Sequence, residues 1–188
     1  MKIPTSHRHR GFTLVELLVV IAIIVVLAAA GFAAGMVAMN KAKKLTSEAA
    51  AKALENAVNN FQVEYSCLPN VGDKVKTDTG DGVKLLNILL GIETDAVKIQ
   101  NVRMLKLLNA KETKSKSGGL LYNTSGRSAV GMYDAWGSPF TVELDTRYEE
   151  RMRVTLGVKT YILNGRSVAV YSPGQDKKLG TPDDIKSW

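Results

Sequence analysis

The sequence predicts an α+β fold, in which a long N-terminal helix packs on a small antiparallel β-sheet domain. An apolar run without any charged side chain extends from Leu17 through Met39. Apolar residues then recur at three- and four-residue spacing as far as Tyr65, which is typical of an amphipathic helix. Short runs of β-branched and aromatic residues follow only in the last third of the chain. A helix followed by clustered strands favours the α+β class.

The apolar run has the length and composition of a membrane-spanning helix. About 20 apolar residues cross a bilayer as a helix, whereas a cleaved signal core has about 7–15. A soluble core helix that is apolar on every side would need a larger protein around it. We therefore expect a transmembrane helix over residues 12–39. Basic residues flank both ends of this segment, so the positive-inside rule does not fix its orientation; they are Lys2, Arg8, Arg10, Lys41, Lys43 and Lys44.

The helical pattern continues through residues 40–66 with an apolar stripe on one side. Since no proline or glycine interrupts residues 37–67, we predict one helix from Phe12 to Tyr65, which Pro69 and Gly72 end. The stripe should pack on the globular domain expected over residues 67–188. It consists of Leu54, Ala57, Val58, Phe61 and Tyr65.

The globular domain shows weaker local patterns. We expect a short helix near residues 83–90, a second over Asp95–Leu108, and a loop over Lys111–Gly119. Three strands are predicted, at residues 140–144, 154–156 and 168–171, with the first two joined as a hairpin across Asp145–Arg153. The sequence has one cysteine, Cys67, which cannot form an intrachain disulfide and which we expect to be a buried thiol.

Glu16 interrupts the apolar pattern near its start. On insertion scales an acidic residue at mid-membrane costs about 2.5–3.5 kcal/mol, so such a residue usually has a partner and a function. The other interpretation is a capping box, with Thr13 as N-cap and Glu16 three residues later, which would place the carboxylate at the membrane surface. The residues alone leave both interpretations open.

The stretch from Arg10 to Ile21 (RGFTLVELLVVI) resembles, without a gap, the N-terminal signature of type IV prepilins and type II secretion pseudopilins. The resemblance implies that residues 1–11 are a leader, that a prepilin peptidase cuts after Gly11, and that the new amine of Phe12 is methylated. It also implies that Glu16 pairs with the Phe12 amine of a neighbouring subunit. The leader would then be cytoplasmic, and the C-terminal domain would lie in the periplasm.

Two further segments resemble the major pseudopilins of type II secretion. Residues 133–140 resemble their D-x-W-G-x-P stretch, in which Trp136 would anchor a turn into a strand. Residues 172–185 are rich in oxygen donors. Composition alone favours an ordinary polar turn there, but the resemblance implies a calcium site at Asp176, Asp183 and Asp184. Lys177 departs from the family pattern, which usually has glycine after the first aspartate.

Enzymatic activity is not expected. The only histidines, His7 and His9, lie in the predicted leader, so no Ser/His/Asp or Cys/His set remains after cleavage. The net charge of +7 is spread over small clusters without interleaved aromatic residues, which favours a solvated basic surface over a nucleic-acid site.

The resemblance therefore predicts a structural subunit of a type II secretion pseudopilus, a homopolymer built through the N-terminal helix. Its partners would be the prepilin peptidase and N-methyltransferase, the inner-membrane assembly platform, minor pseudopilins and membrane lipid. Three alternatives remain open: a type IV (minor) pilin, a DNA-uptake pseudopilin, and a membrane-anchored receptor that never polymerises. A C-terminal loop closed by a disulfide is usual in type IV pilins, and a single cysteine argues against that class.

Overall fold

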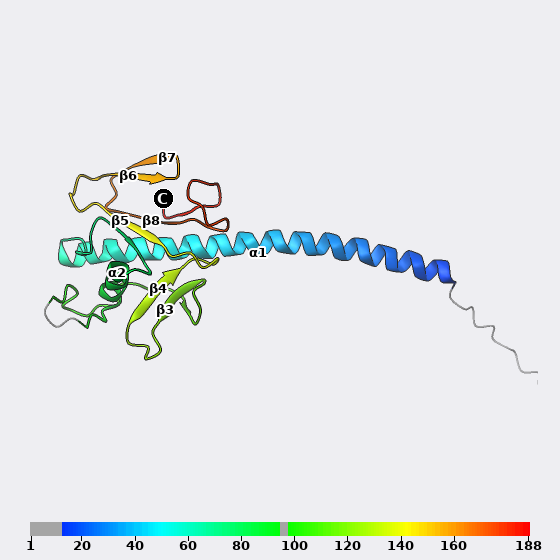
Figure 1. Cartoon of the computed structure of the whole chain (residues 1–188), viewed down its shortest axis with the longest axis horizontal. Helices are drawn as coiled ribbons and strands as arrows, with labels where there is room; N and C mark the ends of the chain where they lie inside the picture. Colours follow the sequence, from blue (N-terminus) through cyan, green and yellow to red (C-terminus); the bar gives the residue numbers. More distant parts are fainter. Residues whose placement is uncertain (1–12, 95–97) are drawn as a thin grey trace, which may run out of the picture. The chain divides into compact units, whose positions relative to one another are not determined.

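A computed structural model describes residues 13–94 and 98–188 of the chain. It divides into two compact units, one up to Lys41 and one from Ala42 to Trp188. Helix α1 (Leu14–Tyr65) is unbroken along its whole length (Figure 1). This confirms the predicted long helix, although Phe12 lies outside the described residues.

The first unit is the apolar half of α1. Its large apolar side chains between Leu14 and Met39 are all at least 45% exposed, and that of Leu14 is 80% exposed. An uninterrupted apolar surface of this extent is not left facing water by a soluble protein. By length and composition the helix can cross a membrane, since it rises by about 1.5 Å per residue and the hydrocarbon core is about 30 Å thick.

The second unit adds one further helix and nine strands within the described residues. These are β1 (Lys74–Lys76), α2 (Gly80–Leu90), β2 (Glu112–Thr113), β3 (Gly119–Tyr122), β4 (Ala129–Tyr133), β5 (Thr141–Leu144), β6 (Arg151–Leu156), β7 (Lys159–Asn164), β8 (Val168–Ser172) and β9 (Ile185–Lys186). The main sheet has the order β1-β5-β8-β9 and is antiparallel throughout. Strands β2-β3-β4 form a second sheet, and β6-β7 form a separate hairpin.

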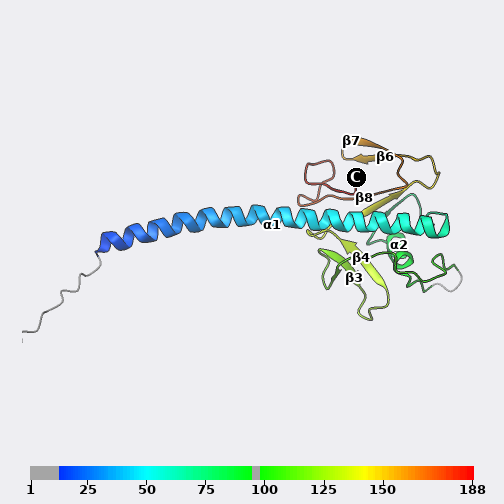
Figure 2. The ribbon, with the colours of Figure 1, turned by 180° about the vertical axis from the view of Figure 1, so that it is seen from behind.

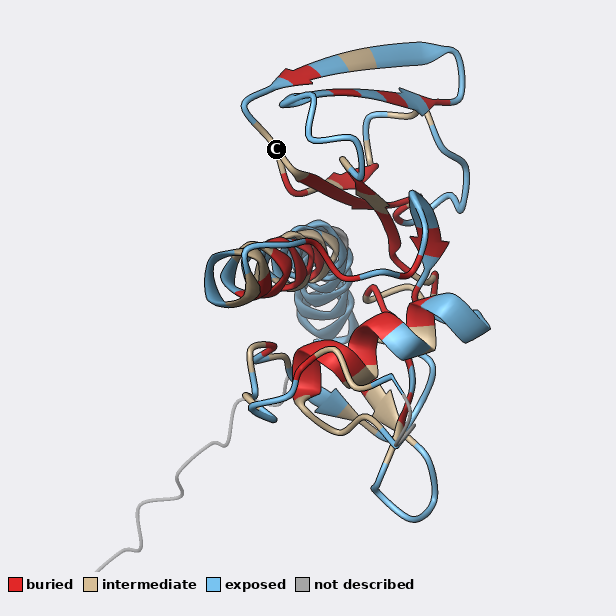
Figure 3. Ribbon diagram, turned by 90° about the vertical axis from the view of Figure 1, so that its left-hand side faces the viewer, coloured by how far each residue is buried: buried red, intermediate tan, exposed pale blue. Residues whose placement is uncertain are grey.

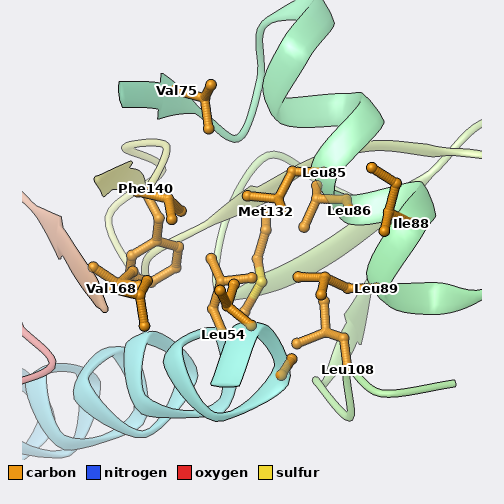
Figure 4. Packing of buried hydrophobic residues seen from close by; sticks show 14 of the residues in the cluster. Leu54, Val75, Leu85, Leu86, Ile88, Leu89, Leu108, Met132, Phe140 and Val168 are labelled. Carbon is orange, nitrogen blue, oxygen red and sulfur yellow. The ribbon is translucent and has the colours of Figure 1, made fainter. Parts of the chain in front are cut away.

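The apolar stripe of α1 forms the centre of the main core. Leu54, Val58 and Phe61 are at most 1% exposed, as the sequence predicts. Figure 4 shows Leu54 pointing into a space between Met132 and Phe140. Each of these side chains contributes about 1.5–3 kcal/mol by leaving water, so this face attaches α1 firmly to the rest of the unit.

Strand β8 separates the main core from a second one. Val168 and Val170 belong to the core on the α1 side, while Ala169 and Tyr171 belong to a cluster under the β6–β7 hairpin. Alternate residues of a strand point to opposite faces, so every residue of β8 is buried. Viewed along α1, the helix, the main sheet and the hairpin lie in three successive layers (Figure 3). From behind, β3 and β4 lie on the opposite side of α1 from this hairpin (Figure 2).

The predicted strand pairing is wrong. Strand β5 does not form a hairpin with β6, because β1 and β8 occupy its two edges. Strand β6 instead pairs with β7 across a tight turn in which Leu156 lies opposite Lys159. Gly157 makes this turn at a φ of +57°, a conformation that glycine adopts without steric cost.

The helix predicted over Asp95–Leu108 is also wrong in its described part, because residues 98–108 contain no helix. The side chain of Asn101 explains this. Its Oδ1 accepts the Leu105 N–H at 3.0 Å, which in a helix would be donated to the Asn101 carbonyl. Its Nδ2 donates to the Ile88 carbonyl at 2.7 Å. Asparagine competes with the helical backbone in this way, and here it ties the loop to α2.

Two smaller expectations also need correction. Cys67 is exposed rather than buried; it lies where α1 has ended and Ser66 has a φ of +56°, and the chain re-enters the core at Leu68. The predicted loop over Lys111–Gly119 contains the short strand β2, whose Glu112 lies opposite Leu120 in a parallel pair.

Gly82 in α2 provides a stability test. A Cβ at this position would lie 1.8 Å from the backbone oxygen of Lys76, so Gly82→Ala forces α2 away from β1. We expect a loss of about 3 kcal/mol, the upper end for overpacking, and a fall in melting temperature of about 6–12 °C. Melting of the full chain in detergent, followed by near-UV circular dichroism, measures it. Gly80→Ala is the matched control, since nothing lies near its Cβ; an equal loss there would contradict the steric explanation.

Candidate functional site

Glu16 caps the start of α1. The Thr13 N–H donates to Glu16 Oε2 at 2.9 Å and the Thr13 hydroxyl donates to the same oxygen at 2.8 Å. The Glu16 N–H donates back to Thr13 Oγ1 at 3.2 Å. This reciprocal pattern is the capping box, which was one of the two interpretations that the sequence left open. The Glu16 side chain is nevertheless exposed in the single chain, and so remains accessible to a partner.

The loop between β8 and β9 is closed by its own carboxylates. Asp183 accepts the Asp176 N–H at 3.0 Å and the Thr181 hydroxyl at 2.6 Å. Asp176 accepts the Lys178 N–H at 2.7 Å, and Asp184 accepts the Gly180 N–H at 2.9 Å. Three backbone N–H groups of the loop thus donate to carboxylates, which makes these hydrogen bonds stronger than neutral ones.

Asp183 and Asp184 have opposite electrostatic environments. Burial acts to raise the pKa of Asp183, but hydrogen bonds from the Thr181 hydroxyl and the Asp176 amide outweigh it and the pKa is lowered. Burial raises the pKa of Asp184, and the Gly180 N–H offsets this only in part. Asp184 is 2% exposed. Its Oδ1 is the one buried side-chain oxygen or nitrogen without a hydrogen bond among the residues that the structure describes.

Lys44 joins this loop to α1. Its ammonium group donates to the Pro182 carbonyl at 3.0 Å. Lys177, which departs from the pattern of the resembled family, has a φ of +59°. Glycine adopts this conformation most readily, so a glycine at this position would fit the turn that Lys177 makes here.

The N-terminal segment decides the class of protein. The model of the family described as the prokaryotic N-terminal methylation motif matches residues 6–32. The chain is a type IV prepilin-like protein. No curated protein and no solved structure matches the chain. The assignment therefore rests on residues 6–32.

In the prepilin-like protein the matched segment contains Gly11, Phe12 and Glu16. The motif implies processing by a prepilin peptidase and assembly into a pilus-type polymer. Gly11 and Phe12, the predicted cleavage and methylation positions, lie outside the described residues, and their roles stay predictions. Gly31 and Gly35 have open space at their Cβ positions in the single chain, so the face that they share is available for close helix contact.

The turn at residues 133–140 depends on Asp134 as well as on Trp136. Asp134 is fully buried, and its Oδ1 accepts the N–H groups of Trp136 and Ser138, each at 2.9 Å. Its Oδ2 accepts the Ser172 hydroxyl at 2.8 Å. Gly137 completes the turn at a φ of +87°. Trp136 is half-buried against the main core, so the turn is structural, as the sequence predicts.

Sequence reasoning missed two residues, Asp134 in the turn at residues 133–140 and Lys44, which contacts the C-terminal loop. Asp134 was expected only as part of a turn motif, although aspartate before a turn commonly binds the amides that follow it, and this signal could have identified it. Lys44 was grouped with its neighbours as a flanking charge. No local signal could have identified its contact with Pro182, which lies near the other end of the chain.

Proposed function

We propose that this prepilin-like protein is a structural subunit of a type II secretion pseudopilus. It would assemble through its N-terminal helix into a periplasmic filament that drives protein secretion. The leader would remain in the cytoplasm, the helix would cross the inner membrane once, and the unit from Ala42 to Trp188 would lie in the periplasm. Its partners would be the prepilin peptidase, the assembly platform and the minor pseudopilins.

The closure of the C-terminal loop supports this choice. The loop is held by carboxylate–amide hydrogen bonds, and the chain has a single cysteine, whereas type IV pilins usually close this region with a disulfide. The proposed role is structural, and it needs only a polymerising helix and a stable domain. A type IV (minor) pilin and a DNA-uptake pseudopilin share the N-terminal motif and are the alternatives.

Deletion of the gene in its native organism tests the role. We expect secreted enzymes to accumulate in the periplasm, and the full chain expressed in trans to restore their release. Measuring one secreted enzyme in periplasm and medium gives the result, with a cytoplasmic enzyme as the lysis control. Normal secretion together with loss of surface pili, or with loss of transformation by DNA, would contradict the proposal and identify the alternative.

We also propose that the C-terminal loop binds calcium. Calcium prefers carboxylate and carbonyl oxygens, and the free, buried Oδ1 of Asp184 is the observation that favours it. Against it, the described residues contain no group of three acidic, histidine or cysteine side chains placed to hold a metal ion. Asp183 and Asp176 would bind the ion only by giving up hydrogen bonds within the loop.

Calcium should therefore raise the melting temperature of the full chain in detergent, because an ion that binds only the folded state stabilises it by mass action. At 100-fold excess over the dissociation constant the gain is about 2.7 kcal/mol, or about 5–10 °C. Asp184→Asn should abolish the shift, whereas Asp78→Asn, at an exposed position far along the chain, should keep it. No shift with calcium and no effect of a chelator would exclude the site.

A further inference from the structure

The loop at residues 101–105 presents two large apolar side chains to solvent. Val102 is 67% exposed and Met104 is 65% exposed. We call this pair the apolar knob. Single exposed apolar residues need no explanation, but these two are held outward by a strained backbone. Met104 has a φ of +50°, which is uncommon for a residue with a side chain and costs about 1–3 kcal/mol.

The loop is fixed in this conformation from several sides. The Met104 N–H donates to the Asn101 carbonyl at 2.9 Å, and the Arg103 N–H donates to the Tyr65 hydroxyl at 3.3 Å. Arg103 also forms an ion pair with Glu64 at the end of α1. Strain of this kind persists where neighbouring contacts impose it, and it is concentrated at functional positions. The apolar knob is thus held in one fixed conformation.

A complementary apolar groove lies elsewhere on the same unit. It has a volume of about 200 Å³ and runs between α1 and the start of β3. Its wall on α1 consists of Thr46, Ser47, Ala49, Ala50 and Ala53. Such small side chains leave room for larger ones from another chain. Lys111 also lines this groove, and Arg103, between the two knob residues, is already paired with Glu64, so the match between the two surfaces is one of apolar shape and not of charge.

We propose that the apolar knob of one copy of this chain docks into this groove of the next copy. The inference rests on the proposed function in one respect, which is that copies polymerise. The groove is at the level of Ala50 and the knob is held at Tyr65, so the two lie about 22 Å apart along α1, at about 1.5 Å per residue. Parallel copies staggered by about this distance bring knob and groove together.

The contact joins two different surfaces, so it does not close on itself. Such heterologous contacts extend into open filaments when the rotation between copies does not close a ring. Two apolar side chains in a small groove fall far short of the ~1,600 Å² of a stable complex. The contact therefore acts only between copies that their membrane helices already hold at high effective concentration.

Disulfide trapping in the full chain tests the proposal. In a Cys67→Ser background, Ala49→Cys and Met104→Cys are introduced together and expressed with a prepilin peptidase. Mild copper-phenanthroline oxidation should then give a ladder of trimers and larger species, because each copy links to two neighbours. The two single variants expressed together should stop at dimers. Ala49→Cys with Val158→Cys is the matched control, since Val158 is 97% exposed on the hairpin turn outside both surfaces.

The outcomes separate this inference from the proposed function. Filaments that form and give no ladder overturn the knob-and-groove contact and leave the pseudopilus role intact. An equal ladder with Val158→Cys shows random collision and likewise overturns the contact. A chain that forms no polymer under any condition overturns both proposals.

Discussion

Replacing Asp134 with alanine should destabilise the unit from Ala42 to Trp188 by about 3–5 kcal/mol, the range for breaking a buried charged network. The substitution leaves two backbone amides and the Ser172 hydroxyl without their acceptor. A buried donor that loses its partner costs about 1–3 kcal/mol. Relief of the buried charge offsets part of this sum. The turn between β4 and β5 and its link to β8 would loosen together.

The melting temperature of the full chain in detergent measures this effect, and we expect a fall of about 6–20 °C. Asp134→Asn separates geometry from charge, since the amide oxygen can still accept both N–H groups and its NH₂ can donate to the Ser172 oxygen; the fall should be less than half as large. Asp78→Ala, at an exposed position, is the surface control. If Asp134→Ala melts within 2 °C of the native chain (about 1 kcal/mol), the turn is not held as described.

Replacing Glu16 with alanine should abolish filament assembly while leaving the protein in the membrane. Insertion becomes easier when a carboxylate is removed from an apolar helix. We propose that Glu16 pairs with the methylated amine of Phe12 on the adjacent subunit; assembly should then fail because that amine loses its counter-charge, and stranding one partner of a buried ion pair costs about 3–5 kcal/mol. At 1.4 kcal/mol per factor of ten, this weakens each addition step by about 10²- to 4 × 10³-fold.

Membrane fractionation and the yield of sheared or cross-linked polymers give the two measurements. Glu16→Gln keeps the hydrogen-bonding shape with Thr13 and removes only the charge, so it should also fail to assemble. Glu48 is the next glutamate along α1, and the control variant Glu48→Ala should assemble normally. Filament yields that do not change in Glu16→Ala would show that the capping box is the whole role of this residue and that the amine has another partner.

Local patterns were sufficient for α1 and α2, although not for the helix expected over Asp95–Leu108, and they identified the apolar stripe of α1 that packs in the core. Helix α1 follows from an apolar run that continues into an amphipathic one without a breaker, and the hydrogen bonds between Thr13 and Glu16 span only three residues. Strands β5, β6 and β8 were expected from their β-branched content. In each of these cases the residues that determine the structure are neighbours in sequence.

Contacts between segments that are distant in sequence could not be predicted from such local patterns. Strand β1 is only three residues, two of them lysines, and nothing in it predicts that it takes the edge of β5. The hydrogen bond from Ser172 to Asp134 joins residues 38 apart, and that from Lys44 to Pro182 joins residues 138 apart. Asn101 replaces an expected helix by contacts with Ile88 and Leu105, which depend on where α2 has already packed.

The position of β8 between two apolar clusters affects how the protein resists proteolysis. Proteases cut chains that open locally, so their access depends on whether one layer can detach while the others stay folded. Detaching the β6–β7 hairpin would expose Ala169 and Tyr171, and detaching α1 would expose Val168 and Val170. Because either opening exposes one face of the same strand, partly open states are costly, and the unit should be cleaved mainly through complete unfolding.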